Sequence, residues 1–177
     1  MKKEWKEVFD KTLQTVGIEI NSNLFSAQSR PRCYWTNIPH APFPTTLSSQ
    51  NIQDILDTDN SNIDKYHLKS QDVSNFLTDY VYDEQHALAI KNPSSGISRL
   101  FSLPKEILKD NERQRRIYSI VGKSPTLLAR TDTTKILVGQ KIRKLTPLEC
   151  ERLQTIPDNY TAMSSDAKRY KLVGRVS

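Results

Sequence analysis

One short polar segment of the sequence combines residues that bind charged or carbonyl-bearing ligands. Gln28-Ser-Arg30-Pro-Arg32 joins a polar loop to a run with strand character. Because alternate side chains of a strand point to the same face, Arg30 and Arg32 are expected to aim two guanidinium groups at one place. These groups are permanently charged planar forks that suit phosphate, carboxylate or the carbonyl oxygen of a pyrimidine. The pentapeptide alone is equally compatible with two surface arginines beside a turn.

A second group of basic residues lies in the second half of the chain. Arg113-Gln-Arg-Arg116 precedes a predicted strand, and further basic residues follow it, interleaved with Tyr118 and polar turns. Arginine and lysine in this setting suit contacts with DNA phosphates and base edges. The predicted DNA-binding residues here are Arg113, Arg115, Arg116, Lys123 and Arg130. The alternative is the solvated basic face of an ordinary domain.

The remaining reactive residue types form no catalytic pattern of their own. Cys33 follows Arg32 in a strand, so alternation turns it away from the arginines and into the core, and Cys150 is a helix-packing residue. The two cysteines are far apart and lack CxxC spacing, so they cannot form a zinc site by themselves. The three histidines show no metal-ligand spacing and are interpreted as surface or structural residues: His40, His67 and His86.

The composition is that of a globular, moderately basic protein. The 177 residues hold one domain, or one domain with a small appendage, and carry a net charge of +6. Residues 1–98 contain 9 basic and 12 acidic side chains, whereas residues 99–177 contain 17 and 8. The second half is therefore the candidate for binding a polyanion. No apolar run approaches the roughly 20 residues of a membrane span, and no signal-peptide core is present, so a cytoplasmic location is expected.

The N-terminal part has the pattern of a piece of an α/β sheet. Apolar residues recur at steps of three to five over residues 3–16, which predicts a helix that Gly17 caps. Residues 17–20 alternate in polarity, and residues 32–38 are a second strand candidate that ends before three prolines. Helix, strand, loop and strand in this order are typical of an α/β fold.

The rest of the chain is predicted to consist of short mixed elements. Short helices are expected near residues 52–56 and 73–80, separated by a polar linker at 57–64. Beyond them the pattern predicts a helix after Pro104, strands at 117–121, 127–129 and 136–138, and a last helix over 166–173.

The clearest local signal is the start of a helix at Thr146. Thr146 is predicted to be the N-cap, Pro147 occupies the first helical position, and Glu149 completes a capping box. Leu145 and Cys150 occupy the two positions of a hydrophobic staple. A helix is therefore expected to begin here.

Two segments, in this order, resemble sequence blocks of the DNA cytosine-5 methyltransferases. Residues 21–38, with Gln28-Ser-Arg-Pro-Arg32, resemble the eighth block, QxRxR followed by a strand. Residues 143–160, which begin Arg143-Lys-Leu-Thr-Pro-Leu-Glu, resemble the ninth block, RxLTPxExxRLQxxP. Residues 170–174 are similar to the approach to the tenth block. The chain is thereby identified as a member of this family, matching its C-terminal portion.

The resemblance implies a specific chemistry and specific roles. Such enzymes flip a cytosine out of duplex DNA, attack its C6 with a cysteine thiolate and transfer a methyl group from S-adenosylmethionine to C5. Arg32 would bind the O2 of the flipped base, while Arg30 and Gln28 would support the pocket. The implied structural anchors are Arg143, Thr146, Glu149, Arg152 and Gln154, and the residue assigned to the cofactor is Gly174.

The resemblance also implies a division of the chain. Residues 1–39 would form an edge of the catalytic α/β domain, which has the Rossmann-like fold of S-adenosylmethionine-dependent methyltransferases. Residues 40–140 would form an inserted target-recognition domain, a small mixed α+β unit. Residues 141–177 would return to the catalytic domain. The implied partner is double-stranded DNA.

Several parts of the family pattern do not occur in the sequence. The Gly-containing cofactor loop, the Pro-Cys nucleophile block and the Glu-Asn-Val block are missing, and Met1 falls close to where the last of these ends. The tenth block reads Gly174-Arg-Val-Ser177 instead of Gly-Asn-Ser/Gly-Trp, without the helix that closes the catalytic domain. The sequence therefore resembles the C-terminal half of a methyltransferase and does not supply the thiolate.

Three hypotheses account for the missing blocks. In the favoured one, the chain is a subunit of a split enzyme, and a companion chain contributes the cofactor loop, the cysteine and the glutamate. In the second, it is a catalytically inert DNA-binding or regulatory module. In the third, it is a truncated remnant with exposed core surface, because the sheet edge around residues 18–20 and 32–38 lacks partner strands. Aggregation or an uncooperative thermal transition would favour the third.

Overall fold

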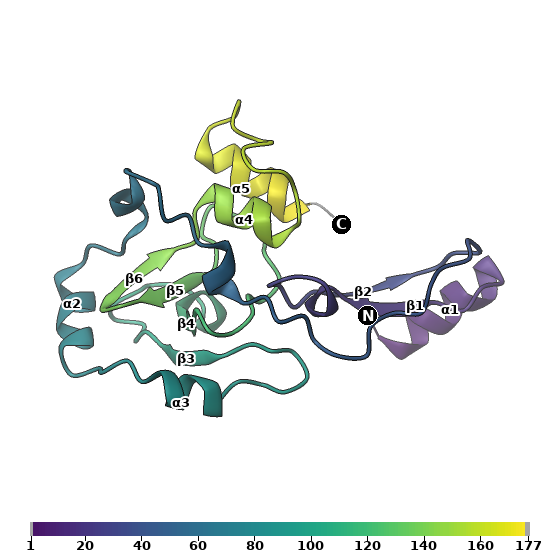
Figure 1. Cartoon of the computed structure of the whole chain (residues 1–177), viewed down its shortest axis with the longest axis horizontal. Coiled ribbons are helices and arrows are strands. Elements are labelled where there is room, and N and C mark those ends of the chain that lie inside the picture. The colour runs from purple at the N-terminus through teal and green to yellow at the C-terminus, as the bar shows by residue number, and fades with distance from the viewer. Residues whose placement is uncertain (1, 176–177) are drawn as a thin grey trace.

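The N-terminal arm, residues 2–39, consists of a helix and a two-stranded hairpin. In the computed structural model, which describes residues 2–175, α1 (Lys3–Leu13) leads into β1 (Ile18–Asn21). β1 pairs antiparallel with β2 (Pro31–Tyr34). The arm extends away from the rest of the molecule (Figure 1).

The helix predicted over residues 3–16 is confirmed with an earlier end. α1 stops at Leu13 because Gln14 adopts a left-handed conformation with φ 50°. Gly17 acts after the helix, where its N–H donates to Asp10 Oδ1 at 2.8 Å. The indole N–H of Trp35 donates to the same oxygen at 2.7 Å. These two donors hold the pKa of Asp10 below its usual value and join α1 to the hairpin.

The second predicted strand is shorter than the sequence pattern indicates. Tyr34 pairs with Ile18, the first residue of β1. Because β1 begins at Ile18, the residues that follow Tyr34 have no β1 residue to pair with. The strand predicted over 32–38 therefore ends at residue 34.

The body of the molecule is built on a four-stranded sheet. Its strands are β3 (Arg99–Ser102), β4 (Arg116–Ser119), β5 (Lys135–Val138) and β6 (Lys141–Lys144), in that spatial order. β4 and β5 run parallel, whereas the other two pairs are antiparallel. Gly139, with φ 58°, supplies the positive φ that a two-residue loop between β5 and β6 uses.

Helices cover both faces of this sheet. They are α2 (Gln71–Thr78), α3 (Glu84–Ala89), α4 (Pro147–Leu153) and α5 (Asp166–Arg175). Strand alternation divides the apolar side chains between two clusters. One cluster packs Val73 and Leu77 of α2 against Ile117, Leu137 and Ile142 of the sheet.

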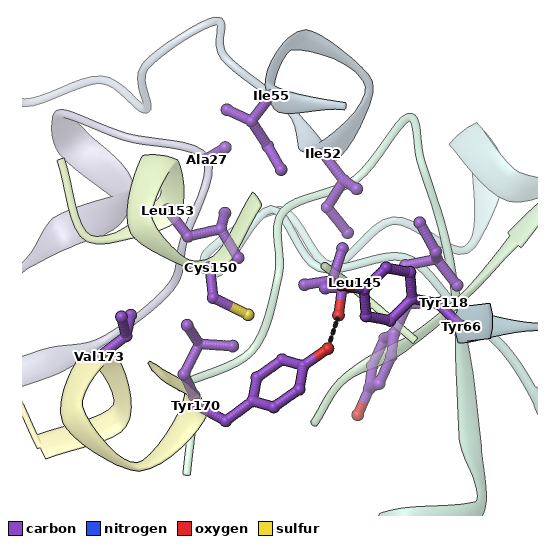
Figure 2. Close-up of a cluster of buried hydrophobic side chains, with 12 residues drawn as sticks. Ala27, Ile52, Ile55, Tyr66, Tyr118, Leu145, Cys150, Leu153, Tyr170 and Val173 are labelled. Atoms are coloured by element: carbon purple, nitrogen blue, oxygen red, sulfur yellow. Dashed lines mark hydrogen bonds between the residues drawn. The ribbon is translucent and has the colours of Figure 1, made fainter. Parts of the chain in front are cut away.

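The other cluster joins all three parts of the chain that the family resemblance separates. It contains Ala27 from the arm, Ile52 and Tyr118 from the middle, and Leu145 and Tyr170 from the C-terminal part. Figure 2 shows these side chains together, with the Tyr170 hydroxyl donating to the Leu145 carbonyl oxygen at 2.7 Å. The boundary expected at residue 140 falls inside the β5–β6 hairpin.

Two predicted elements do not form. After Pro104 the chain makes a single turn, closed by the N–H groups of Ile107 and Leu108 on the Pro104 carbonyl, instead of a helix. Residues 127–129 are not a strand, because both edges of β4 are already paired with β3 and β5. The polar linker predicted at 57–64 runs into a 3₁₀ turn, Ile63–Tyr66.

Other elements were only partly foreseen. The helix expected near residues 52–56 is a 3₁₀ turn, Ile52–Ile55. α3, β3 and β6 have no counterpart among the predicted elements. None of the helices formed by residues 2–175 has the length and apolar character that a membrane span requires.

Candidate functional site

The segment that carries the paired arginines is held by hydrogen bonds on two sides. Asn21 Oδ1 accepts from the Arg30 N–H at 2.8 Å. On the other side, the Ser29 N–H donates to the Ser124 carbonyl oxygen, and the Ser124 N–H donates to Ala27, both at 2.8 Å. The backbone that leads into β2 is therefore fixed between the hairpin and the body.

Arg30 and Arg32 line the same hollow, which has a volume of about 360 Å³. The volume lies within the range of small-molecule sites, roughly 300–1,000 Å³. Other residues of the wall come from the arm and from the end of α4 and include Phe25, Tyr34, Phe43, Leu153, Gln154 and Thr155. The structure thus brings segments 21–38 and 143–160 to one cavity. The strand alternation that predicted a common direction for the two arginines is consistent with this arrangement.

The hollow is electropositive. Arg30 is buried, and its burial together with the charge of Arg32 lowers its pKa, although a guanidinium stays protonated at neutral pH. Arg32 is half-buried and donates to the Pro31 carbonyl oxygen at 2.8 Å. Within residues 2–175 no carboxylate forms an ion pair with Arg32. The hollow can therefore present guanidinium donors to an anion or to a carbonyl oxygen.

Gln28 is buried and does not line the hollow. Its exposed fraction is 1%, and it forms an isolated parallel bridge with Ser124. The direct DNA contact predicted for Gln28 is contradicted, because a ligand at the surface does not reach it. Its supporting role in the pocket stays a prediction.

Two arginines of the predicted DNA-binding cluster are already engaged within the protein. Arg115 donates to the carbonyl oxygens of Leu103 and Asp110. Arg116 forms a two-pronged ion pair with Glu112, and this interaction lowers the pKa of Glu112 to about 2. The phosphate contact predicted for Arg115 stays a prediction, because its guanidinium is half-buried and already bonded to two carbonyl oxygens, and Arg116 would have to leave its carboxylate partner.

Arg113 and Arg130 are the exposed arginines of this region. Arg113 is exposed and makes no ion pair with another part of residues 2–175. Arg130 is also exposed, and its guanidinium lies 4.0 Å from Asp110. These two side chains retain the freedom to meet phosphates.

Lys123 is buried, contrary to the predicted DNA contact. Its exposed fraction is 1%, and its ammonium group donates to the carbonyl oxygens of Ser26 at 2.8 Å and Gln50 at 2.7 Å. Positive charge in a sequence does not distinguish a surface lysine from one that links two backbone segments. The prediction for Lys123 is therefore wrong.

The capping box at Thr146 is confirmed, and it is part of a buried ion pair. The Thr146 N–H donates to Glu149 Oε2 at 2.7 Å, and Thr146 Oγ1 accepts from the Glu149 N–H at 3.1 Å. Arg143 donates through both terminal nitrogens to the Glu149 carboxylate at 2.7 and 2.8 Å. The N–H of Asp57 is the fourth donor to this carboxylate, at 3.0 Å. One carboxylate thus joins β6, α4 and the segment at residue 57.

Arg152 and Gln154 extend these connections. Arg152 pairs with Asp158 at 2.7 Å and donates to the Leu56 carbonyl oxygen at 3.0 Å. Gln154 donates to the Val173 carbonyl oxygen at 3.1 Å, which links the end of α4 to α5, and it also lines the hollow.

Glu151 is a buried anchor that the sequence pattern did not single out. Its carboxylate is buried and accepts from the N–H groups of Asn159 and Thr161, both at 2.9 Å. Arg169 of α5 donates to it at 3.1 Å. The available sequence signal was a glutamate on the packed face of an amphipathic helix, which requires a partner when buried.

A comparison with known protein families identifies the family of the chain. The sequence profile described as C-5 cytosine-specific DNA methylase matches residues 9–176, most of the chain. The chain belongs to the C-5 cytosine-specific DNA methylase family. A comparison with curated proteins found no match to the chain.

Members of this methylase family transfer a methyl group from S-adenosylmethionine to cytosine in DNA, and neither of the two cysteines lines the hollow that holds Arg30 and Arg32. Burial raises the pKa of the Cys150 thiol to about 12. Cys33 is half-buried on β2 and outside both apolar clusters, so the expectation that it enters the core is wrong. Among residues 2–175 no three potential ligand side chains are placed to hold a metal ion.

The residue that the resemblance assigns to the cofactor has a packing role in the structure. Gly174, the residue assigned to S-adenosylmethionine by resemblance, lies in α5 against the backbone of residues 128–129. A Cβ at this position would lie 2.4 Å from the Leu128 carbonyl oxygen. The missing side chain therefore serves helix packing. The final two residues of the tenth-block segment, Val176 and Ser177, lie outside the described residues.

Proposed function

We propose that this chain binds duplex DNA and holds the flipped cytosine while a methyl group is transferred from S-adenosylmethionine to its C5. The observation that carries the proposal is the electropositive hollow lined by Arg30, Arg32 and the end of α4. Arg32 has its side chain at this hollow and would donate to the O2 of the cytosine. Arg30 would add charge behind it.

The residues for DNA contact are proposed to be Arg113 and Arg130. Both are exposed and belong to the part of the chain with surplus positive charge, residues 99–177. The division into an arm, a recognition part at 40–140 and a C-terminal part remains a prediction. Three strands of the mixed sheet, β3 to β5, lie within the recognition part and support it, whereas the common core and the β5–β6 hairpin cross its proposed boundaries.

The catalytic cysteine and the cofactor loop are proposed to come from a companion chain or from another part of the same polypeptide. Support comes from the arm, where α1 has no buried residue. Trp5, Val8 and Leu13 are at least half exposed, on one face of the helix. Contiguous apolar surface of this kind marks a contact site. The occupant we propose is the remainder of the methylase catalytic domain.

A DNA-binding series tests the recognition role. For a 30-bp duplex, the logarithm of the binding constant is expected to fall linearly with the logarithm of salt concentration. Arg113→Ala and Arg130→Ala are each expected to reduce that slope by about 1. Arg99→Ala removes the same charge from a guanidinium already bound to Glu112 at 2.6 Å, and serves as the control. Binding that does not respond to salt would refute the role.

A reconstitution assay tests the base-binding role. The chain is mixed with a candidate companion that carries the Pro-Cys and cofactor-loop blocks, and methyl transfer to DNA is measured. Arg32→Ala should abolish transfer while duplex affinity largely remains. Loss of affinity with unchanged turnover at saturating DNA would overturn the assignment, and no gain over the companion alone would favour an inert DNA-binding module.

A further inference from the structure

The position of Arg30 and Arg32 depends on a segment almost one hundred residues away in the sequence. We propose that residues 123–126 form a clasp that positions the base-binding arginines, with Lys123 as its principal positioning residue. The inference rests on the proposed function of Arg32 and gives a new role to Lys123, which the sequence pattern had placed at the DNA surface. Backbone hydrogen bonds of the residues before β2 lead to this segment.

Residues 26–29 form no helix and no regular strand, so their polar backbone groups need partners elsewhere. Lys123 Nζ donates to the Ser26 carbonyl oxygen at 2.8 Å. The Ser124 N–H donates to Ala27, and the Ser124 carbonyl oxygen accepts from Ser29, both at 2.8 Å. The clasp therefore engages three of the four residues that immediately precede Arg30.

The fourth contact comes from a side chain at the end of the clasp. Thr126 Oγ1 donates to the Ser29 carbonyl oxygen at 3.1 Å. Ser29 is thus bonded through both its N–H and its carbonyl group. This double attachment fixes the backbone one residue before Arg30.

The Lys123 side chain passes close to Gly96, where the absence of a side chain leaves room for it. Gly96 has φ 73°, and a Cβ there would lie 2.9 Å from Lys123 Cδ. The Lys123 N–H donates to the Gly96 carbonyl oxygen at 2.8 Å, so the backbone is held beside this opening. A glycine at residue 96 satisfies both the positive φ and the close approach of the lysine stem.

The Lys123 ammonium group connects two backbone segments through hydrogen bonds to carbonyl oxygens. Its acceptors are the carbonyl oxygens of Ser26 and Gln50, at 2.8 and 2.7 Å, and no carboxylate of residues 2–175 forms a salt bridge with it. Burial lowers the pKa of Lys123. A buried ammonium is costly unless its hydrogen bonds are made. Ser26 also lines the hollow, so the lysine acts directly behind the wall of the proposed base-binding site.

Small displacements of such a wall have large effects on a reaction. A shift of about 1 Å in a reacting group or in the group that holds it can reduce turnover by about a hundredfold. If the clasp is released, residues 26–29 lose four hydrogen bonds, and Arg30 and Arg32 are no longer fixed toward the hollow. The predicted result is weaker retention of an extrahelical cytosine with little change in affinity for paired DNA.

Two lysine variants of the full chain separate positioning from general stability. Lys123→Met keeps the length of the side chain and removes its donors. Lys91→Met is the control, because Lys91 Nζ donates to the Val121 carbonyl oxygen at 2.9 Å and to Asn51 Oδ1 at 3.2 Å and makes no hydrogen bond to residues 26–29. Thr126→Val is a milder variant that tests the clasp even if Lys123→Met does not fold.

Hydrogen exchange is the first measurement. In Lys123→Met the Ser29 amide should exchange roughly tenfold faster than in the wild type, as the loss of a buried hydrogen-bond partner implies. Amides of β4 and β5 should change far less, and Lys91→Met should leave Ser29 unchanged. Thr126→Val should show the same local effect at smaller size. Equal acceleration throughout the sheet, or none at Ser29, would overturn the clasp.

Binding of a modified duplex is the second measurement. The probe is a 30-bp duplex with one cytosine opposite an abasic site, because extruding that cytosine breaks no base pair. The wild type should bind it more tightly than the fully paired duplex, and Lys123→Met and Thr126→Val should lose most of that preference. An unchanged preference in both variants would refute the positioning role alone. A wild type without any preference would refute the proposed function of Arg32 itself.

Discussion

Replacing Glu149 by glutamine is expected to cause a large loss of stability with almost no change in shape. The Glu149 carboxylate is fully buried and accepts from both terminal nitrogens of Arg143, from the Thr146 N–H and from the Asp57 N–H. In Glu149→Gln, the buried Arg143 guanidinium loses its counter-charge. An unpaired buried charge of this kind costs about 3–5 kcal/mol of unfolding free energy.

The expected cost can be measured by urea and thermal unfolding of the full chain. For a domain of this size, a loss of about 3–5 kcal/mol lowers the midpoint temperature by roughly 6–20 °C. Glu112→Gln is the control, because it makes the same change in an exposed carboxylate that pairs with Arg116 and Arg99. Exposed pairs contribute little, so this variant should unfold close to the wild type.

Two outcomes would refute this reasoning. If Glu149→Gln and Glu112→Gln lost similar stability, burial would not be the reason for the cost. If Glu149→Gln lost less than about 1 kcal/mol, the guanidinium of Arg143 would be finding water or another partner, and the buried pair would not anchor β6 to α4.

Three further predictions concern other parts of the chain. Gly174→Ala should lower the unfolding free energy by about 1–3 kcal/mol, because a methyl group would lie 2.4 Å from the Leu128 carbonyl oxygen, and an unchanged urea midpoint would contradict this packing. Burial lowers the pKa of His67, so its neutral form is favoured on folding; the stability this contributes is complete above pH about 6.5 and is lost as the pH falls below that value. Urea unfolding between pH 7 and 5 should therefore show a flatter pH dependence for His67→Gln, and an identical slope would argue against it. With a thiol reagent at pH 8, Cys33 should react quickly and Cys150 only after denaturation, whereas rapid modification of both in native protein would contradict the burial of Cys150.

Features that depend only on neighbouring residues could be predicted from the sequence. The capping box at Thr146 involves Glu149 three residues on, and the structure contains both of its hydrogen bonds. Arg30 and Arg32 are two residues apart, so alternation alone predicts a common direction, and both line one hollow. The family resemblance rested on the same two segments, and the family profile matches them.

Pairing between distant segments could not be obtained in this way. Residues 127–129 have the apolar character of a strand, but β4 already has β3 and β5 as neighbours, so they form none. The turn after Pro104 has helix-forming residues and still closes only once. Each outcome depends on which edges and faces are already occupied, and this is a property of the assembled sheet.

The charge pattern shows the same division most clearly. The sequence by itself determined that the second half is basic and that two arginines precede a strand. Only the tertiary structure decided that Arg113 is exposed, that Arg115 is bound to carbonyl oxygens, and that Lys123 is buried behind the hollow. The physical reason is that the composition gives only the number of charged residues. Whether each one is buried, and what it bonds to, depends on contacts between segments nearly one hundred residues apart.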